Sequence, residues 1–471
     1  MFISGLTIWI NKNYSILRIK TQGNKPYLCG MSGSIKSQRN ILEKLKIEQL
    51  NPMQEEARAA IHSGPEVVLL SPTGTGKTLA FLLPLIAELD PANTEVQALI
   101  LTPSRELTIQ IEQVVREMGT GFKTNAVYGG RPFSKDRTAL KHAPAILVGT
   151  PGRVADHLRR RSFNPDEIKT LVLDEFDKSL EVGFEFEMTE IIEALKGVTK
   201  KILTSATQEA EVPAFVGLRK PRVISFLADK KSKLEVKAII SPDKDKIESL
   251  VTLLKHLGDQ PGIVFCNYKD SINRVSEFLE EHGIPHGCFY GGVEQIDRER
   301  ALIKFRNNTY KIIVATDLAA RGLDIPELKF IIHYQLPKKP EEFTHRNGRT
   351  ARMNSGGTAY VIQWEEEGLP PFIRDEKPEI LNIDDLKPAE EKPQSDWETL
   401  FVSGGRKDKI SKGDIAGLFM KQGRLNGEQV GVIEIKQDCA FVAVKSSKVD
   451  QLIELVNNSK LKKKKVRVTK I

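Results

Sequence analysis

Residues 71–78 read Ser-Pro-Thr-Gly-Thr-Gly-Lys-Thr, a glycine-containing segment that ends in a cation and a hydroxyl. The apolar run 66–70 before it predicts a buried strand, and residues 79–85 after it predict a helix. A strand, a glycine turn and a helix form a cradle in which backbone N–H groups and the helix N-terminus hold phosphates. In such a cradle Lys77 reaches the β- and γ-phosphates, and the Thr78 hydroxyl ligates Mg²⁺. The predicted triphosphate site comprises Ser71, Thr73, Gly74, Thr75, Gly76, Lys77 and Thr78, with Ser71 where the general pattern has glycine.

A carboxylate-rich segment, Asp174-Glu175-Phe176-Asp177, follows the apolar run 169–173. That run predicts a buried strand, so the acids are expected at its C-terminal end, beside the phosphate loop of an α/β sheet. Asp174 suits holding Mg²⁺, and Glu175 suits polarising the attacking water. The alternative interpretation is a solvated acidic turn, which an acid directly after an apolar strand disfavours.

Charge is distributed unevenly along the 471 residues, whose net charge is +8. From residue 401 to 471, 16 lysines and arginines stand against 7 acids, whereas residues 365–398 hold 12 acids and 4 bases. Residues 364–398 also contain five prolines, so we expect a flexible acidic linker there. The basic segment beyond it permits nucleic-acid binding.

The four cysteines, Cys29, Cys266, Cys288 and Cys439, form no Cys-x-x-Cys pair. A zinc site or a disulfide framework is therefore not expected, and a cytoplasmic location fits. No apolar run reaches the length of a membrane span. Residues 1–30 match nothing downstream, and one hypothesis is that translation begins at Met31.

The alternation of strands and helices predicts an α/β fold with two tandem parallel-sheet domains, at residues 41–226 and 234–363, after an N-terminal extension at 1–40. A small α+β domain at residues 401–471 is expected beyond the linker. Expected strands lie at 67–70, 97–102, 145–149, 170–173 and 201–205 in the first domain, and at 262–266, 311–315, 330–333 and 358–362 in the second.

Ordered motifs across residues 41–365 resemble those of the DEAD-box RNA helicases of superfamily two. The resemblance implies two RecA-like domains and ATP hydrolysis coupled to RNA strand separation. The matching segments are 51–54, 71–78, 103–107, 129–130, 150–153, 174–177, 205–207, 264–267, 291–298, 315–324 and 345–352.

The resemblance assigns further roles around the triphosphate. Gln54 reads the adenine, which favours ATP over GTP. Arg349 and Arg352 are implied arginine fingers, and their spacing places them on one face if that segment is helical. Asp324 is the implied ribose contact. Asp177, Ser205 and Thr207 are implied to couple hydrolysis to strand separation.

The implied RNA contacts would bind phosphate and sugar, which fixes register without reading sequence. They are Pro103, Arg105, Gly130, Thr150 and Arg153 in the first domain, and Gly292, Gln295 and Thr316 in the second.

Three departures from the family pattern stand out. Phe176 replaces an alanine, and Ala351 replaces a glycine. No aromatic residue lies between Gly30 and Gln54 to stack on adenine.

Residues 401–471 resemble the C-terminal RNA-binding domain of DbpA-like helicases, a fold similar to the RNA-recognition motif. Strands are expected at 430–434, 440–444 and 466–471, and helices at 412–421 and 449–456. The resemblance implies docking on structured ribosomal RNA during ribosome assembly. A solvated charge run is the alternative meaning of Lys462–Lys465.

The function expected from these observations is an ATP-dependent RNA helicase, monomeric, with ATP and Mg²⁺ as cofactors and no membrane partner. Two alternatives remain: an ATP-gated RNA clamp with slow turnover, and a DNA helicase of the same superfamily.

Overall fold

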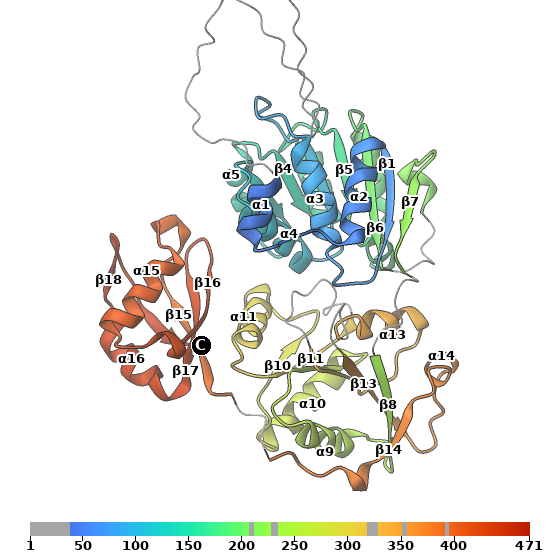
Figure 1. The fold of residues 1–471 in the computed structure, drawn as a ribbon, viewed down its shortest axis with the longest axis vertical. Helices are drawn as coiled ribbons and strands as arrows, with labels where there is room; N and C mark the ends of the chain where they lie inside the picture. The colour runs from blue at the N-terminus through green and yellow to red at the C-terminus, as the bar shows by residue number, and fades with distance from the viewer. Residues whose placement is uncertain (1–37, 207–211, 228–233, 318–327, 351–355, 391–394) are drawn as a thin grey trace, which may run out of the picture. The chain divides into compact units, whose positions relative to one another are not determined.

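The computed structural model describes residues 38–206, 212–227, 234–317, 328–350, 356–390 and 395–471. These residues form two seven-stranded parallel sheets and one four-stranded antiparallel sheet (Figure 1). The α/β fold class, with two parallel-sheet domains and a small tail domain, is thereby confirmed. Among the described helices, none combines the length and the apolar character that a bilayer crossing needs.

The first sheet has the strand order β3-β4-β2-β5-β6-β1-β7. The strands are β1 (Glu66–Leu70), β2 (Ala98–Leu101), β3 (Thr124–Val127), β4 (Ile146–Gly149), β5 (Thr170–Leu173), β6 (Lys200–Ser205) and β7 (Arg222–Ser225). The five strands expected here are present, and the two missed strands, β3 and β7, are the edges of the sheet. Edge strands are less apolar because only part of their surface is buried.

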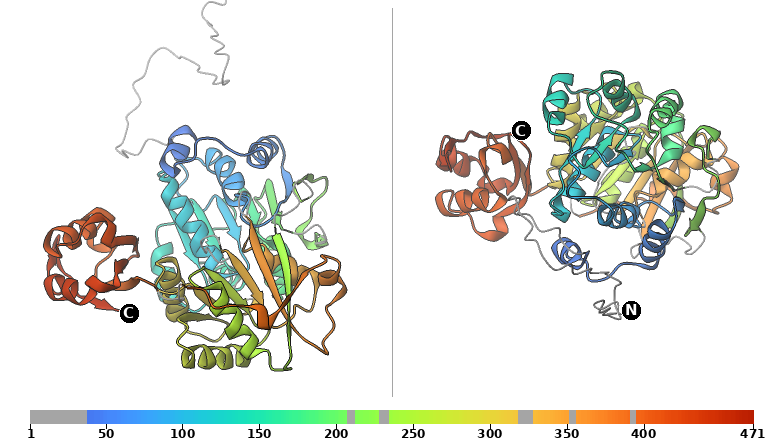
Figure 2. Two further views of the ribbon diagram at one scale, coloured as in Figure 1. Left: turned by 60° about the horizontal axis from the view of Figure 1, so that its bottom comes forward. Right: turned by 90° about the horizontal axis from the view of Figure 1, so that it is seen from above.

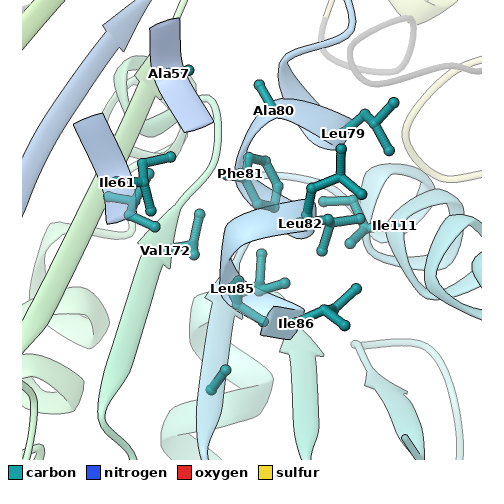
Figure 3. Packing of buried hydrophobic residues seen from close by; sticks show 14 of the residues in the cluster. Ala57, Ile61, Leu79, Ala80, Phe81, Leu82, Leu85, Ile86, Ile111 and Val172 are labelled. Carbon is teal, nitrogen blue, oxygen red and sulfur yellow. The ribbon is translucent and has the colours of Figure 1, made fainter. Parts of the chain in front are cut away.

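Helices cover both faces of this sheet, as successive strand residues point to opposite sides. Val67 and Leu69 join one buried cluster and Val68 the other. The first face is covered by α1 (Gln38–Leu45), α2 (Pro52–Ser63), α3 (Lys77–Ala87) and α4 (Arg105–Met118). The second is covered by α5 (Phe133–Leu140), α6 (Pro151–Arg159), α7 (Phe176–Glu181) and α8 (Glu185–Ala194). Figure 3 shows Phe81, Leu82, Leu85 and Ile86 of α3 with Ala57 and Ile61 of α2 and Ile111 of α4.

The second sheet has the order β10-β11-β9-β12-β13-β8-β14. Its strands are β8 (Leu234–Ser241), β9 (Gly262–Phe265), β10 (His286–Phe289), β11 (Ile312–Ala315), β12 (Phe330–His333), β13 (Gly357–Trp364) and β14 (Glu379–Asn382). Helices α9 (Ile247–Leu257) and α10 (Lys269–Glu281) cover one face, and α11 (Gln295–Arg306) covers the other. Helix α13 (Pro340–Asn347) follows β12. Figure 2 shows the ribbon from two further sides, with this domain in yellow-green to orange.

The expectation of a flexible linker at residues 364–398 is wrong for much of its length. Residues 379–382 form β14, which pairs in parallel with β8 and extends the second sheet. Helix α14 (Pro371–Arg374) buries Ile373 against the same domain. The apolar side chains spaced between the acids, such as Ile373 and Leu381, supply a buried face that average charge conceals.

The tail domain has the sheet order β16-β17-β15-β20. Its strands are β15 (Trp397–Val402), β16 (Val430–Ile435), β17 (Ala440–Lys445) and β20 (Val468–Lys470). Helices α15 (Lys412–Gly417) and α16 (Val449–Val456) pack on one face of this sheet. The first strand begins at Trp397, before the expected boundary at residue 401.

Candidate active site and RNA-binding face

The phosphate loop connects β1 to α3, as its sequence predicts. Gly74 and Gly76 have φ values of 80° and 88°, a left-handed conformation that favours glycine. Lys77 lies inside the loop, where its Nζ donates to the carbonyl oxygens of Ser71 at 2.5 Å and Pro72 at 2.9 Å. Burial lowers the pKa of Lys77, while Glu175, Asp174 and Asp177 oppose that effect. The Lys77 ammonium is therefore positioned to bind a negatively charged phosphate group.

The glutamine motif is bound to the phosphate loop. Asn51 caps α2 in a reciprocal pair with Gln54 and donates from Nδ2 to the Thr75 carbonyl at 3.0 Å. Gln54 donates from Nε2 to the Gly76 carbonyl at 3.2 Å and accepts from the Asn51 N–H at 3.0 Å. A Cβ on Gly76 would lie 2.3 Å from that Nε2 and would displace the Gln54 amide, in addition to straining the backbone at a φ of 88°. The Gln54 amide thus joins the loop to the start of α2, and its contact with adenine stays a prediction.

The carboxylates follow β5, two strands from β1, because β6 lies between them. Asp174 is 3% exposed, and burial together with the neighbouring Glu175 charge raises the pKa of Asp174 to about 6. Glu175 has a φ of 49°, which is uncommon for a residue with a side chain. A strained backbone held at this turn is typical of a functional site.

Thr204 of β6 holds this turn, and the sequence motifs did not single it out. Its Oγ1 donates to Asp174 Oδ1 at 2.5 Å and accepts from the Glu175 N–H at 3.1 Å. The coupling role implied for Ser205 and Thr207 beside Asp177 stays a prediction: Ser205 is buried at the end of β6, and Thr207 lies outside the described residues. Asp177 lies 3.5 Å from Lys178 Nζ and 3.9 Å from His345 Nε2.

We expect Thr204→Val to reduce RNA-stimulated ATP hydrolysis about tenfold or more. The valine keeps the buried volume but leaves the Glu175 N–H and the Asp174 carboxylate without this partner, a loss of roughly 1–3 kcal/mol. Steady-state hydrolysis and thermal unfolding would be measured together. Thr189→Val, whose hydroxyl donates to the Glu185 carbonyl in an exposed bond on α8, is the matched control. Full activity of Thr204→Val would show that the turn is held by other contacts.

Contacts join the first and second domains at the phosphate loop and at the start of α4. Thr73 Oγ1 donates to the Gly348 carbonyl at 3.1 Å, and Arg298 Nη2 lies 3.0 Å from Glu106 Oε1. Arg349 is 6% exposed and close enough for its charge to oppose protonation of Lys77. The second domain therefore brings a guanidinium to the phosphate loop.

The condition under which Arg349 and Arg352 would share one helical face is not met at Arg349. Helix α13 ends at Asn347, and Arg349 lies in the turn that follows. The glycine at position 348 ends the helix, because glycine lowers helix stability. Arg352, Ala351 and Asp324 lie outside the described residues.

Arg346, three residues before Arg349, has a different environment. It is 1% exposed and donates to both oxygens of Asp317 at 2.6 Å and to Asn267 Oδ1 at 2.7 Å. Its guanidinium is fully engaged inside the second domain, so its role is to hold that domain together.

Phe176 is the bulkiest departure from the family pattern, and its side chain points into the hydrophobic core, away from the candidate ATP site. Its side chain is 1% exposed and packs in the cluster with Leu173, Met188 and Leu203. The idea of slow turnover caused by Phe176 therefore has no support in the packing.

The first-domain residues implied to contact RNA gather at one end of the sheet. Pro103 follows β2, Gly130 follows β3 and Thr150 follows β4, and these three strands are neighbours. The carboxyl ends of parallel strands share one edge. The residues of the ATP site follow β1, β5 and β6, so the two candidate sites occupy opposite halves of the same edge.

Two arginines support this RNA face from within. Arg105 begins α4 beside Gly130, where a Cβ would lie 2.5 Å from Arg105 Nη1. Arg153 donates from Nε to Asp136 Oδ2 at 2.8 Å and from Nη2 to the Arg131 carbonyl at 2.7 Å. Asp136 is buried and was not singled out by any motif.

In the second domain, Gly292 and Thr316 follow the neighbouring strands β10 and β11, and Gln295 begins α11. Gly292 has a φ of 103°, which requires glycine. These three predicted contacts thus share one end of the second sheet.

We expect Asp136→Asn to raise the RNA concentration that gives half-maximal ATP hydrolysis about tenfold. The amide cannot hold Arg153 as a carboxylate does, since hydrogen bonds to charged groups are stronger. The KM for ATP should stay unchanged. Asp156→Asn on α6, whose carboxylate pairs with Arg159 on an exposed surface, is the control. An unchanged RNA requirement would contradict a positioning role for Asp136.

Comparison with known proteins agrees with this geometry. Residues 51–215 match the family described as DEAD/DEAH box helicase, residues 245–354 the helicase conserved C-terminal domain, and residues 399–470 the DbpA RNA binding domain. The chain is 33% identical over 436 residues to the ATP-dependent RNA helicase DbpA of Escherichia coli, covering 91% of this chain and 95% of that protein. It is 30% identical over 460 residues to the Bacillus subtilis protein of the same name, covering 91% and 96%.

Solved structures share the fold. Saccharomyces cerevisiae Dbp5 bound to RNA and ADP BeF3 has a TM-score of 0.65 at 25% identity, covering 74% of this chain and 94% of that one. The chain belongs to the DEAD-box ATP-dependent RNA helicases. Within that family it is of the DbpA type, with the DbpA RNA-binding domain as its tail, and it is an RNA-dependent ATPase and helicase.

Proposed function

We propose that this helicase hydrolyses ATP to separate short duplexes in ribosomal RNA during ribosome assembly, while its tail domain anchors it to the target. The observation that carries the enzymatic part is the convergence of both parallel-sheet domains on one phosphate loop. Thr73 contacts Gly348, and the Arg349 charge reaches Lys77. The match of the tail to an RNA-binding domain supports the anchoring part.

ATP would sit against the loop between β1 and α3. Lys77 and the N–H groups of residues 74–78 would bind its phosphates, and Gln54 would hold its base edge. Glu175 would orient the attacking water, and Arg349 would meet the charge that develops on the γ-phosphoryl. Because Arg349 and the loop belong to different domains, hydrolysis would require the two domains to come together.

The donors of the acidic turn and the phosphate loop together fit Mg²⁺. Asp174 and Thr78 offer the hard oxygen ligands this ion prefers. The pKa of Asp174 is raised by burial and by Glu175, so a divalent cation would relieve the repulsion between these acids. When bound, the ion would neutralise charge on the phosphates.

The RNA would lie along the strand ends that carry Pro103, Gly130, Thr150 and the second-domain residue Thr316. These groups suit the sugar-phosphate backbone, so the helicase domains would bind RNA with little regard to sequence. Selection of a ribosomal target would fall to the tail. We further propose a cytoplasmic, monomeric protein.

ATP hydrolysis by the whole chain and by a chain ending at Gln394 tests this proposal. Each would be assayed without nucleic acid, and with poly-RNA, single-stranded DNA or ribosomal RNA. We expect ribosomal RNA to stimulate the whole chain most strongly, at least tenfold above poly-RNA at limiting concentration, and truncation to remove that preference. Equal stimulation of both proteins by any RNA would refute the ribosomal assignment, and stimulation by DNA alone would refute the RNA assignment.

A further inference from the structure

One face of the tail sheet is not free. In β15, Leu400 and Val402 point into the tail core, so Thr399 and Phe401 lie on the opposite face. Thr399 is nevertheless fully buried. Its Oγ1 accepts from Asn307 Nδ2 at 3.2 Å and lies 2.6 Å from Thr309 Oγ1. Residues 307–309, directly after α11 of the second domain, therefore cover this part of the tail sheet.

A charged clamp holds the same contact. Arg306, the last residue of α11, donates from Nε and Nη2 to the two oxygens of Glu434 on β16, at 2.7 and 2.9 Å. Two parallel bonds from one guanidinium fix orientation as well as distance. This ion pair therefore fixes the orientation of the tail domain on the second domain.

Beside this contact lies a cavity of about 700 Å³ with walls from both domains. Helix α11 contributes Arg300 and Lys304, and the last tail strand region contributes Arg467 and Lys470. Tyr310 and Phe401 add aromatic rings. Two acids lie among these cations. Asp297 also lines the cavity, 3.2 Å from Arg300. Glu398 lies 2.7 Å from Lys470, and its charge acts on Lys304 as well.

Four cations and two aromatic rings in one cavity match the chemistry of single-stranded nucleic acid. Cations bind phosphates, and aromatic rings stack on bases without reading their identity. The position along α11 agrees with this ligand, because Gln295, an implied RNA contact, begins the helix that carries Arg300 and Lys304. A strand leaving the second domain would meet the cavity within about 14 Å of Gln295, at 1.5 Å of helix rise per residue.

We propose that this cavity is a composite binding site for single-stranded RNA, which continues the RNA path from the helicase domains to the tail. The site exists only while the tail is docked, since each domain supplies half of its cations. The proposal rests on RNA being the substrate. It adds a specific consequence: the Arg306–Glu434 clamp is needed for full RNA affinity although neither residue lines the cavity.

The test is the affinity of the whole chain for a fluorescein-labelled 20-nucleotide oligouridylate, measured by anisotropy at several salt concentrations. We expect the double variant Lys304→Ala/Arg467→Ala to bind about tenfold more weakly. Its salt dependence should be shallower by about 1.4 in log–log slope, for two lost phosphate contacts with a single strand. Lys255→Ala/Lys377→Ala removes the same charge from the second domain outside the cavity, and should bind within twofold of the unaltered protein.

Glu434→Gln tests the docking requirement. It leaves all four cavity cations in place, yet we expect weaker oligouridylate binding because the tail loses its clamp. RNA-stimulated ATP hydrolysis at saturating RNA serves as the folding control and should stay within twofold for every variant. If the unaltered protein binds the RNA and the double variant binds it equally well, the composite site is refuted. The helicase function would then be unaffected. Failure of the unaltered protein to bind the oligouridylate would overturn both.

Discussion

Replacing Glu175 with glutamine is expected to reduce RNA-stimulated ATP hydrolysis by about two to four orders of magnitude. Glu175 follows the strand that also positions Asp174, and the Thr204 hydroxyl fixes its backbone N–H. The amide keeps the shape of the side chain but removes the basic oxygen that would orient water. ATP affinity should change little, because Lys77 and the loop remain. Single-turnover hydrolysis and equilibrium binding of a fluorescent ATP analogue would separate the two effects.

Glu185→Gln is the control for this change. It removes one negative charge from the start of α8 in the same domain, outside the acidic turn. Hydrolysis by Glu185→Gln should match that of the unaltered protein. If Glu175→Gln also retained its activity, another residue would have to orient the water, and the assignment of the acidic turn would fail.

Arg349→Ala is expected to lower kcat by about a thousandfold, within the range measured for arginine fingers. The guanidinium is buried at the contact between the first two domains, close enough to influence Lys77. Because it would act on charge that develops during phosphoryl transfer, its loss should reduce kcat far more than ATP binding. Rapid-quench measurement of the chemical step with saturating ATP and RNA would show this.

Variants of two other arginines distinguish a catalytic role of Arg349 from a structural one. Arg374→Ala removes an equal charge from α14 and should leave kcat within twofold. Arg346→Ala should instead lower the midpoint of thermal unfolding, since Asp317 and Asn267 would lose a buried partner. A large loss of stability in Arg349→Ala, with normal kcat, would reverse the roles given to these residues.

The strands could be predicted from the sequence where both of their faces are buried. The central strands β5 and β12 have the bounds that their apolar runs indicate, because both faces of a parallel sheet are covered by helices. The edge strands β3 and β7 carry polar or exposed residues and gave no such signal. The prediction of a flexible linker at residues 364–398 failed for a related reason. The acidic residues lie on the exposed face, whereas the Ile373 and Leu381 side chains pack against the second domain.

The candidate site divides in the same way. The glycines and Lys77 of the phosphate loop and the carboxylates after β5 are local features, because a turn followed by a helix needs those residue types in that order. Thr204, Asp136 and the Arg298–Glu106 pair are not local. Thr204 lies thirty residues beyond Asp174 in the chain, and only the pairing of β5 with β6 brings their side chains together.

By itself, then, the sequence determined the chemistry of this protein: a triphosphate loop, an acidic turn, and two parallel sheets followed by a basic tail. These depend on residue types within short windows, where propensity and spacing act directly. Tertiary structure alone decided which groups hold the acidic turn, and that Arg349 lies in a turn after α13. It alone placed the face of the tail sheet against residues 306–309 of the second domain. The contacts between the tail and the second domain join residues 90 or more positions apart, and their geometry follows from how whole sheets pack.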